Sequence, residues 1–258
     1  MQQNFGERKL RDLKPSTILL AALLLAPISA AAQSEDTALE AKLAAKVAEY
    51  NLSANGLADA LAKTAKRFQL PIGIEWVRDK EALRGLSLTW RDETVENIIS
   101  TVVKKHPGYR YKAEHGVVHV FRTNLINDPH NFLDLKVPDF FEVREEIGGV
   151  ANQQLQHVIQ DRVSARKLPP GAGYGGSYAS GLEQRPLSLS LRGATVREAL
   201  DKLVSASEHK MWIVTFSDSP ELTPTGFRRT ETLWHPAPFP DRDQPMWDFL
   251  GWEEYPPK

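Results

Sequence analysis

The sequence predicts an α+β protein of two small two-layer α/β units, in which helices pack on short mixed sheets, with an extended Pro/Trp-rich C-terminal tail. The first reason is a repeat with an offset of 101 residues: LSLTWRDETVENIISTVV at 86–103 and LSLSLRGATVREALDKLV at 187–204. In both copies the apolar spacing changes from every second residue to i, i+3, i+4, i+7, which is typical of a strand followed by an amphipathic helix. Repeats at this period are usually duplicated small domains, because solenoid units run about 20–50 residues.

The composition of the tail is a further observation, because it differs from that of both units. Residues 218–258 hold eight of the 17 prolines and three of the six tryptophans. Proline removes a backbone donor and fixes φ, so this high proline content favours an extended arm over regular structure. We expect one strand in it, near 229–234.

The first 32 residues have the composition of a secretory signal peptide. Basic residues at 8–14 precede the apolar run 18–26, and small residues at 30–32 suit cleavage before Gln33. The stretch from 18 to 32 is shorter than the roughly 20 residues of a spanning helix, so cleavage is favoured over retention as an anchor. The chain has no cysteine for a lipid anchor or a disulfide. We therefore expect a periplasmic or secreted protein.

Charge and length limit the possible partners. The expected signal peptide carries two more basic than acidic residues, so removing it takes the formal net charge from −1 to −3. A nearly neutral chain without a long basic run is not expected to bind nucleic acid. No second apolar run is long enough to cross a bilayer, so we expect no integral membrane span after signal cleavage.

Changes of composition divide the chain into six segments. These are a signal peptide (1–32), a leader that is helical or disordered (33–50), a first α+β unit (51–123), a linker (124–131), a second α+β unit (132–217) with a Gly/Tyr-rich insertion (168–186), and the tail (218–258). The insertion takes the place that the segment PIGIEWV occupies in the first unit.

Each unit has its own predicted elements. In the first unit we expect helix 57–68, a strand through 72–76, the repeat strand and helix, and a hairpin that turns at 114–116. In the second we expect strand 132–137, helix 142–166, the repeat strand and helix, and strand 211–216. Thr195 and Glu198 have the spacing of a capping box at the start of the second repeat helix.

The first unit resembles the short N-terminal (STN-like) domain shared by secretins and TonB-dependent outer-membrane transducers. The resemblance covers about residues 50–122, and a degenerate copy of its second half lies at 187–216. The matching segments are Leu57–Ala62, Phe68–Ile74, Leu86–Leu88, Thr94–Val95 and Gly116–Val120. The resemblance implies a small sandwich of two helices against short sheets, and a role in protein–protein contact in the bacterial envelope. The chain differs from those families because it has no room for a pore domain or a membrane barrel, so the partner is not implied.

Sequence motifs that could indicate catalysis or ligand binding lack the neighbouring elements and companion residues that such a site needs. GAGYGG at 171–176 matches a dinucleotide fingerprint as a string, but Pro169 and Pro170 precede it where a strand is required. The two Ser-x-x-Lys strings at 164–167 and 207–210 have no companion motif of an acyl-transfer enzyme. His115 and His119 do not have the spacing of a helical metal site. We expect no catalytic residue, no cofactor and no metal.

The sequence thus favours a non-enzymatic, exported protein–protein interaction module of the cell envelope. The alternative is an exported hydrolase with a site between the two units. Aromatic side chains in the insertion and the tail are the candidate contact residues, since Trp and Tyr are enriched at binding hot spots. Whether the tail aromatics dock a partner or cover the chain's own sheet is left open. The candidates are Tyr174, Tyr178, Trp234, Trp247, Phe249 and Trp252.

Overall fold

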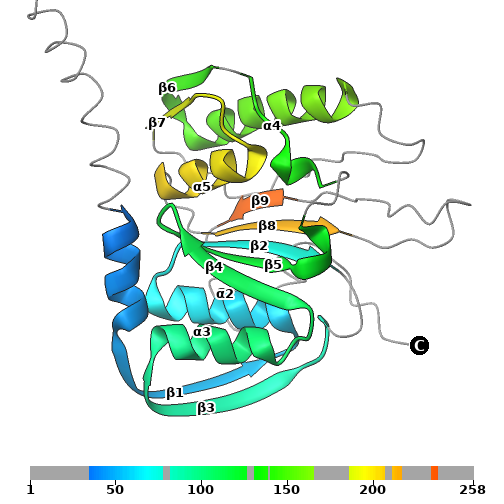
Figure 1. The fold of residues 1–258 in the computed structure, drawn as a ribbon. Coiled ribbons are helices and arrows are strands. Elements are labelled where there is room, and N and C mark those ends of the chain that lie inside the picture. Colours follow the sequence, from blue (N-terminus) through cyan, green and yellow to red (C-terminus); the bar gives the residue numbers. More distant parts are fainter. Residues whose placement is uncertain are drawn as a thin grey trace, which may run out of the picture.

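The structure is a computed structural model that describes residues 35–77, 82–126, 131–138, 140–165, 186–206, 211–216 and 234–237. Helices and short sheets alternate along the chain, so the predicted α+β class is confirmed (Figure 1). The elements of the first half follow a helix at residues 35–44. They are β1 (Lys46–Ala54), α2 (Leu57–Phe68), β2 (Ile72–Val77), β3 (Leu86–Thr94), α3 (Val95–Lys104), β4 (Tyr109–Glu114), β5 (Val117–Arg122) and η1 (Thr123–Leu125).

The second half repeats much of this order. Its elements are η2 (Phe132–Asp134), β6 (Phe141–Ile147), α4 (Gly148–Ala165), β7 (Pro186–Leu191), α5 (Val196–Ala206), β8 (Met211–Phe216) and β9 (Trp234–Ala237). Both copies of the repeated sequence are a strand followed by a helix: β3 with α3, and β7 with α5. Each repeat strand pairs antiparallel with the strand that opens its half, β3 with β1 and β7 with β6.

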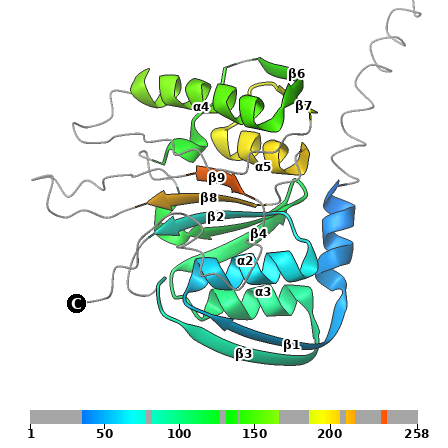
Figure 2. The ribbon, with the colours of Figure 1, turned by 180° about the vertical axis from the view of Figure 1, so that it is seen from behind.

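A five-stranded sheet in the order β4-β5-β2-β8-β9 joins the two halves. The central strand β2 is parallel to β5 on one side and to β8 on the other. Helices α2 and α3, backed by the β1–β3 ribbon, cover one face of this sheet. Helices α5 and α4 and the β6–β7 ribbon lie on the other face (Figures 1 and 2). The sheet therefore belongs to both predicted units.

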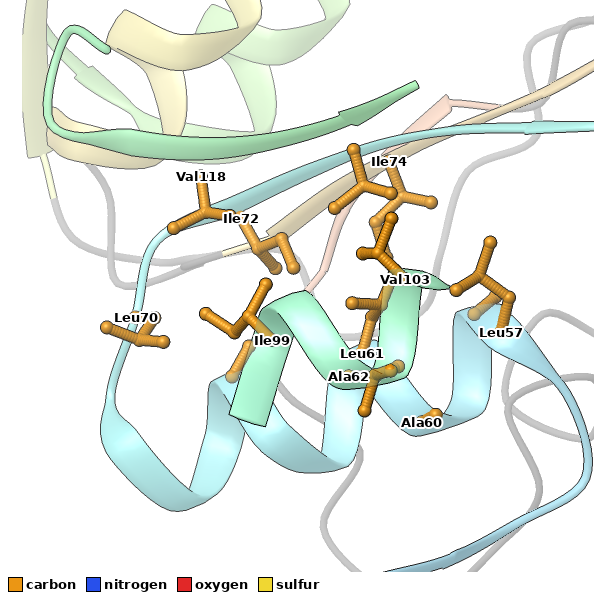
Figure 3. Packing of buried hydrophobic residues seen from close by; sticks show 14 of the residues in the cluster. Leu57, Ala60, Leu61, Ala62, Leu70, Ile72, Ile74, Ile99, Val103 and Val118 are labelled. Carbon is orange, nitrogen blue, oxygen red and sulfur yellow. The ribbon is translucent and has the colours of Figure 1, made fainter. Parts of the chain in front are cut away.

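Alternation along the central strands produces two separate cores. Ile72 and Ile74 of β2 point toward α2 and α3, together with Val118 of β5 (Figure 3). Val77 and Val117 belong to the core on the other face, with the apolar stripe of α5. Residues one apart on a strand point to opposite faces, so each central strand contributes to both cores.

The strand–helix pairs of the two halves are related by a half-turn about an axis that lies in the sheet, across the strands, together with a shift along that axis from β4 to β8. The equivalent strands β4 and β8 run in opposite directions, since β4 is antiparallel to β5 and β8 is parallel to it through β2. The helices that pack with each pair lie on opposite faces (Figure 1). Among the described residues of the second half, no strand is equivalent to β2. The insertion 168–186 has that position in the sequence, and all of it before Pro186 lies outside the described residues.

Three expectations about local structure were wrong. Residues 132–137 do not form a strand: Phe132–Asp134 is a 3₁₀ turn, and Lys136 makes only an isolated bridge with Thr195. The start of the expected helix 142–166 is strand β6, and the helix begins at Gly148. The helical or disordered leader ends earlier than expected, because residues 46–50 belong to β1.

The capping box at the second repeat helix is confirmed. The backbone N–H of Thr195 donates to Glu198 Oε2 at 2.7 Å, and the N–H of Glu198 donates to Thr195 Oγ1 at 3.2 Å. In the first copy Thr94 Oγ1 accepts from the N–H of Asn97 at 3.2 Å. Both repeat helices thus begin at a threonine that satisfies an otherwise unpaired N–H.

Candidate functional site

Ionisable side chains meet between the central sheet and α5, in a group that we call the polar layer. It is defined by Glu75 on β2, His119 on β5, Trp212 on β8, Arg197 and Asp201 on α5, and Asn131 and Asp134 at η2. Arg197 and Asp201 are one helical turn apart, which places both on the same side of α5. The layer lies where the two halves of the chain contact each other.

The first part of the polar layer is centred on Asp201. Its Oδ1 accepts a hydrogen bond from the indole N–H of Trp212 at 2.8 Å, and its Oδ2 lies 3.1 Å from His119 Nε2. Gly73 is the register partner of both His119 and Trp212 and lies between them on β2. A Cβ atom at Gly73 would lie 2.3 Å from the indole ring. The glycine therefore leaves the space over β2 in which the Trp212 ring lies, with its centroid 5.9 Å from that of His119.

The second part of the polar layer is centred on Arg197. Its Nε donates to Glu75 Oε1 at 2.8 Å, and its Nη1 donates to Asp134 Oδ1. Asn131 Nδ2 is 3.4 Å from Glu75 Oε2 and also donates to the carbonyl of Leu125. Burial acts to lower the pKa of Arg197, but the charges and hydrogen bonds of Glu75 and Asp134 outweigh it and raise the pKa. The guanidinium is therefore a permanent cation that joins β2 to α5 and η2.

The chemistry open to the polar layer is limited by its burial. The side chains of His119 and Asp201 are 3 % and 2 % exposed, and that of Glu75 is 3 % exposed. A general acid or base must come within hydrogen-bond reach of a substrate, and these groups are closed off by α5. Within the described ranges, no group of three or more His, Cys, Asp or Glu could hold a metal ion. In those same ranges no helix is long and apolar enough to span a bilayer.

The outer edge of β4 is the second candidate site. In the part of the chain that the structure describes, β4 pairs with β5 on one side and with no strand on the other. Arg110, Lys112 and Ala113 are exposed, and Lys112 forms an ion pair with Glu114. Tyr111 is half-buried against the first core, and burial, followed by the charge of Glu96, raises its pKa. This edge offers backbone donors and acceptors beside a row of charged side chains.

Of the candidate contact residues taken from the sequence, only Trp234 lies in a described element. Its backbone is in β9, opposite Val214 of β8, so the tail contributes an edge strand to the chain's own sheet. The other five lie outside the described residues: Tyr174, Tyr178, Trp247, Phe249 and Trp252.

The polar layer was not predicted from the sequence, although two ionisable residues within apolar runs indicate it. Glu75 interrupts the apolar run IGIEWV, and His119 interrupts VVHVF. A charged or ionisable residue in the middle of a buried strand needs a partner, because its unpaired burial is costly. The partners come from α5: Arg197 follows Glu75 by 122 residues and Asp201 follows His119 by 82 residues, so the pairing itself was not predictable. No family model, no curated protein and no solved structure matches the chain.

Proposed function

We propose that this chain is a non-enzymatic, exported protein–protein interaction module of the bacterial cell envelope, related in design to the short N-terminal domain of secretins and TonB-dependent transducers. The proposal is supported by the first half of the fold. Its order β1-α2-β2-β3-α3-β4-β5 places two helices between a two-stranded ribbon and the strands β4-β5-β2. The resemblance implies such a sandwich, and the signal peptide expected at 1–32 would carry it out of the cytoplasm.

The observation on which the proposal mainly depends is that the buried ionisable groups connect elements of the fold to one another. Glu75, Arg197 and Asp201 each bind a side chain on another element, so they connect β2, β8, α5 and η2. A buried group that is paired in this way contributes to the specificity of packing. We therefore assign partner recognition to the surface, where a sheet edge can bind a partner protein through backbone groups and side pockets.

Export and partner binding can be tested together. A C-terminally tagged chain is expressed in its own cells, which are separated into cytoplasm, envelope and medium. We expect a product that lacks residues 1–32, outside the cytoplasm, and a defined envelope protein bound to it at fixed stoichiometry after cross-linking. Retention of the whole chain in the cytoplasm contradicts export. An isolated, monomeric product with no bound protein contradicts the interaction role.

The alternative of an exported hydrolase has one observation in its favour, the 3.1 Å approach of His119 Nε2 to Asp201 Oδ2. Such a site requires α5 to move away from the sheet before a substrate can reach the pair. The test is to assay the purified chain and His119→Gln on ester, peptide and glycan substrates. Hydrolysis that the substitution abolishes, without a change of the thermal midpoint, supports the enzyme and contradicts the interaction module.

A further inference from the structure

The chain contains an example of how two such units join edge to edge. Strand β8 of the second half pairs in parallel with β2 of the first half over six register pairs, from Ile72–Met211 to Val77–Phe216. The half-turn that relates the halves makes β4 the equivalent of β8. The outer edge of β4 is therefore the same edge that β8 uses to bind β2, and in the described part of the chain it has no strand beside it.

The side chains follow the same equivalence. The repeat offset of 101 aligns Tyr111 with Trp212, and each packs toward the helices of its own half. On the opposite face, Lys112 aligns with Ile213, and Arg110 aligns with Met211. Met211 and Ile213 are buried under α2 and α3 of the neighbouring unit. Arg110 and Lys112 are exposed.

We propose that the outer edge of β4 docks a partner protein through an α+β unit of the same kind, whose β2-like strand runs parallel to β4. This proposal rests on the proposed function and assigns the surface and the class of partner. By the half-turn geometry, the helices of the docked unit lie over the face of β4 that carries Arg110 and Lys112. Those helices must present carboxylates there, because Arg110 and the Lys112–Glu114 ion pair together leave one excess positive charge on this face.

No strand in the described part of a second copy of this chain fits this edge. The docked strand must offer an edge equivalent to the one that β2 gives to β8. In this chain β5 and β8 occupy both edges of β2. The described residues of the second half contain no counterpart of β2 that could replace it. Since no described strand of a second copy offers this edge, the occupant that we propose is a different protein.

The test uses a photo-cross-linker on the edge and matched positions elsewhere. Because the chain has no cysteine, Ala113→Cys of the mature full chain can be labelled specifically with a benzophenone maleimide and incubated with solubilised envelope from its own cells. Ser87→Cys and Ser190→Cys, exposed at the outer faces of the two ribbons, are the controls. We expect one cross-linked protein, formed from position 113 with about tenfold higher yield than from either control.

Charge reversal then tests the chemistry of the partner. In the Ala113→Cys background, Lys112→Glu should lower the cross-linked yield about tenfold, because it places like charges opposite each other. Lys202→Glu, an exposed reversal on α5, should leave the yield unchanged. Circular dichroism melts of both variants confirm that they are folded.

Each other outcome overturns the proposal. A cross-link to a second copy of this chain, or a yield that is insensitive to Lys112→Glu, excludes an acidic heterologous unit at β4. Products from Ser87 or Ser190 but not from position 113 exclude the β4 edge and leave the interaction module intact. No product from any of the three positions counts against both proposals.

Discussion

At the scale of single residues, Arg197 is the side chain whose removal should cost most. Its loss leaves the Glu75 carboxylate, 3 % exposed, without its cation. We expect Arg197→Met to lower the free energy of unfolding by about 3 kcal/mol, the usual cost of breaking a buried ion pair from one side. Urea unfolding followed by circular dichroism measures this. Adding Glu75→Gln to Arg197→Met should recover part of the loss, because it removes the unpaired charge.

The matched control for Arg197 is Arg144, which pairs with Glu142 at 2.9 Å on the surface and is 78 % exposed. Exposed pairs contribute little, so Arg144→Met should leave the urea midpoint unchanged. Equal effects of the two substitutions would show that Arg197 does not act as a buried connector.

Gly73 should be intolerant of a side chain because of Trp212. An alanine Cβ would lie 2.3 Å from the indole ring, so the ring or the strand must shift. We expect Gly73→Ala to cost about 1–3 kcal/mol, as overpacking of a core does. At Gly85 a Cβ would lie 3.3 Å from the carbonyl of Ala54, so Gly85→Ala should cost less. A Gly73→Ala variant as stable as the native chain would contradict the close packing of Trp212 over β2.

Tyr50 makes stability depend on pH at the alkaline end. Burial is the main cause of its raised pKa, next to the stacked Trp90 ring at 5.6 Å. The folded chain keeps the phenol proton to higher pH than the unfolded chain does. The stability that this group contributes is therefore complete below about pH 10 and is lost as the pH rises through the raised pKa. Tyr50→Phe should lose less stability than the native chain as the pH rises above about 10, measured by urea unfolding. Parallel curves for the two proteins would contradict this.

At the scale of elements, β4 should resist self-association because of its charges. Exposed edge strands are often protected by charged side chains, and Arg110 and Lys112 are exposed on β4. We expect Arg110→Val with Lys112→Val to form dimers or larger species that the native chain does not form. Sedimentation velocity measures this, and Ser87→Val is the control on an outer ribbon face. A monomeric double variant would show that the charges do not protect the edge.

Local patterns explain why some elements were predictable and others were not. The strand β3 and helix α3 were predictable because Val95, Ile98, Ile99, Val102 and Val103 change the apolar spacing within a few residues, and all five are buried. Strand β6 was taken for the start of a helix. Its residues FEVREEI carry as many charges as a surface helix, and it is a strand because it pairs with β7. That pairing joins residues 39 to 50 positions apart, which no local pattern reports.

At the scale of the whole molecule, the sequence predicted two units but not the shared sheet. The repeat indicated two similar strand–helix pairs, and the structure has both. The alternation of β2 was consistent with either an edge or a central strand. Its central position depends on β8, which lies 139 residues later in the chain. The polar layer was hidden for the same reason, because its partners meet only when β8 and α5 close over β2.

The shared sheet predicts that the chain unfolds as one cooperative unit. Separating the halves would break the six β2–β8 register pairs. It would also expose the buried side chains of Glu75, His119 and Trp212 to solvent. The remaining first half would have an open, apolar β2 edge, which is prone to aggregation. We expect a single urea transition with the same midpoint by circular dichroism and by tryptophan fluorescence, as two-state unfolding requires. Fragment 33–126 should be insoluble or should lack a cooperative melt. Two separate transitions, or a fragment that melts like the native chain, would mean that the two halves are independent domains that merely touch.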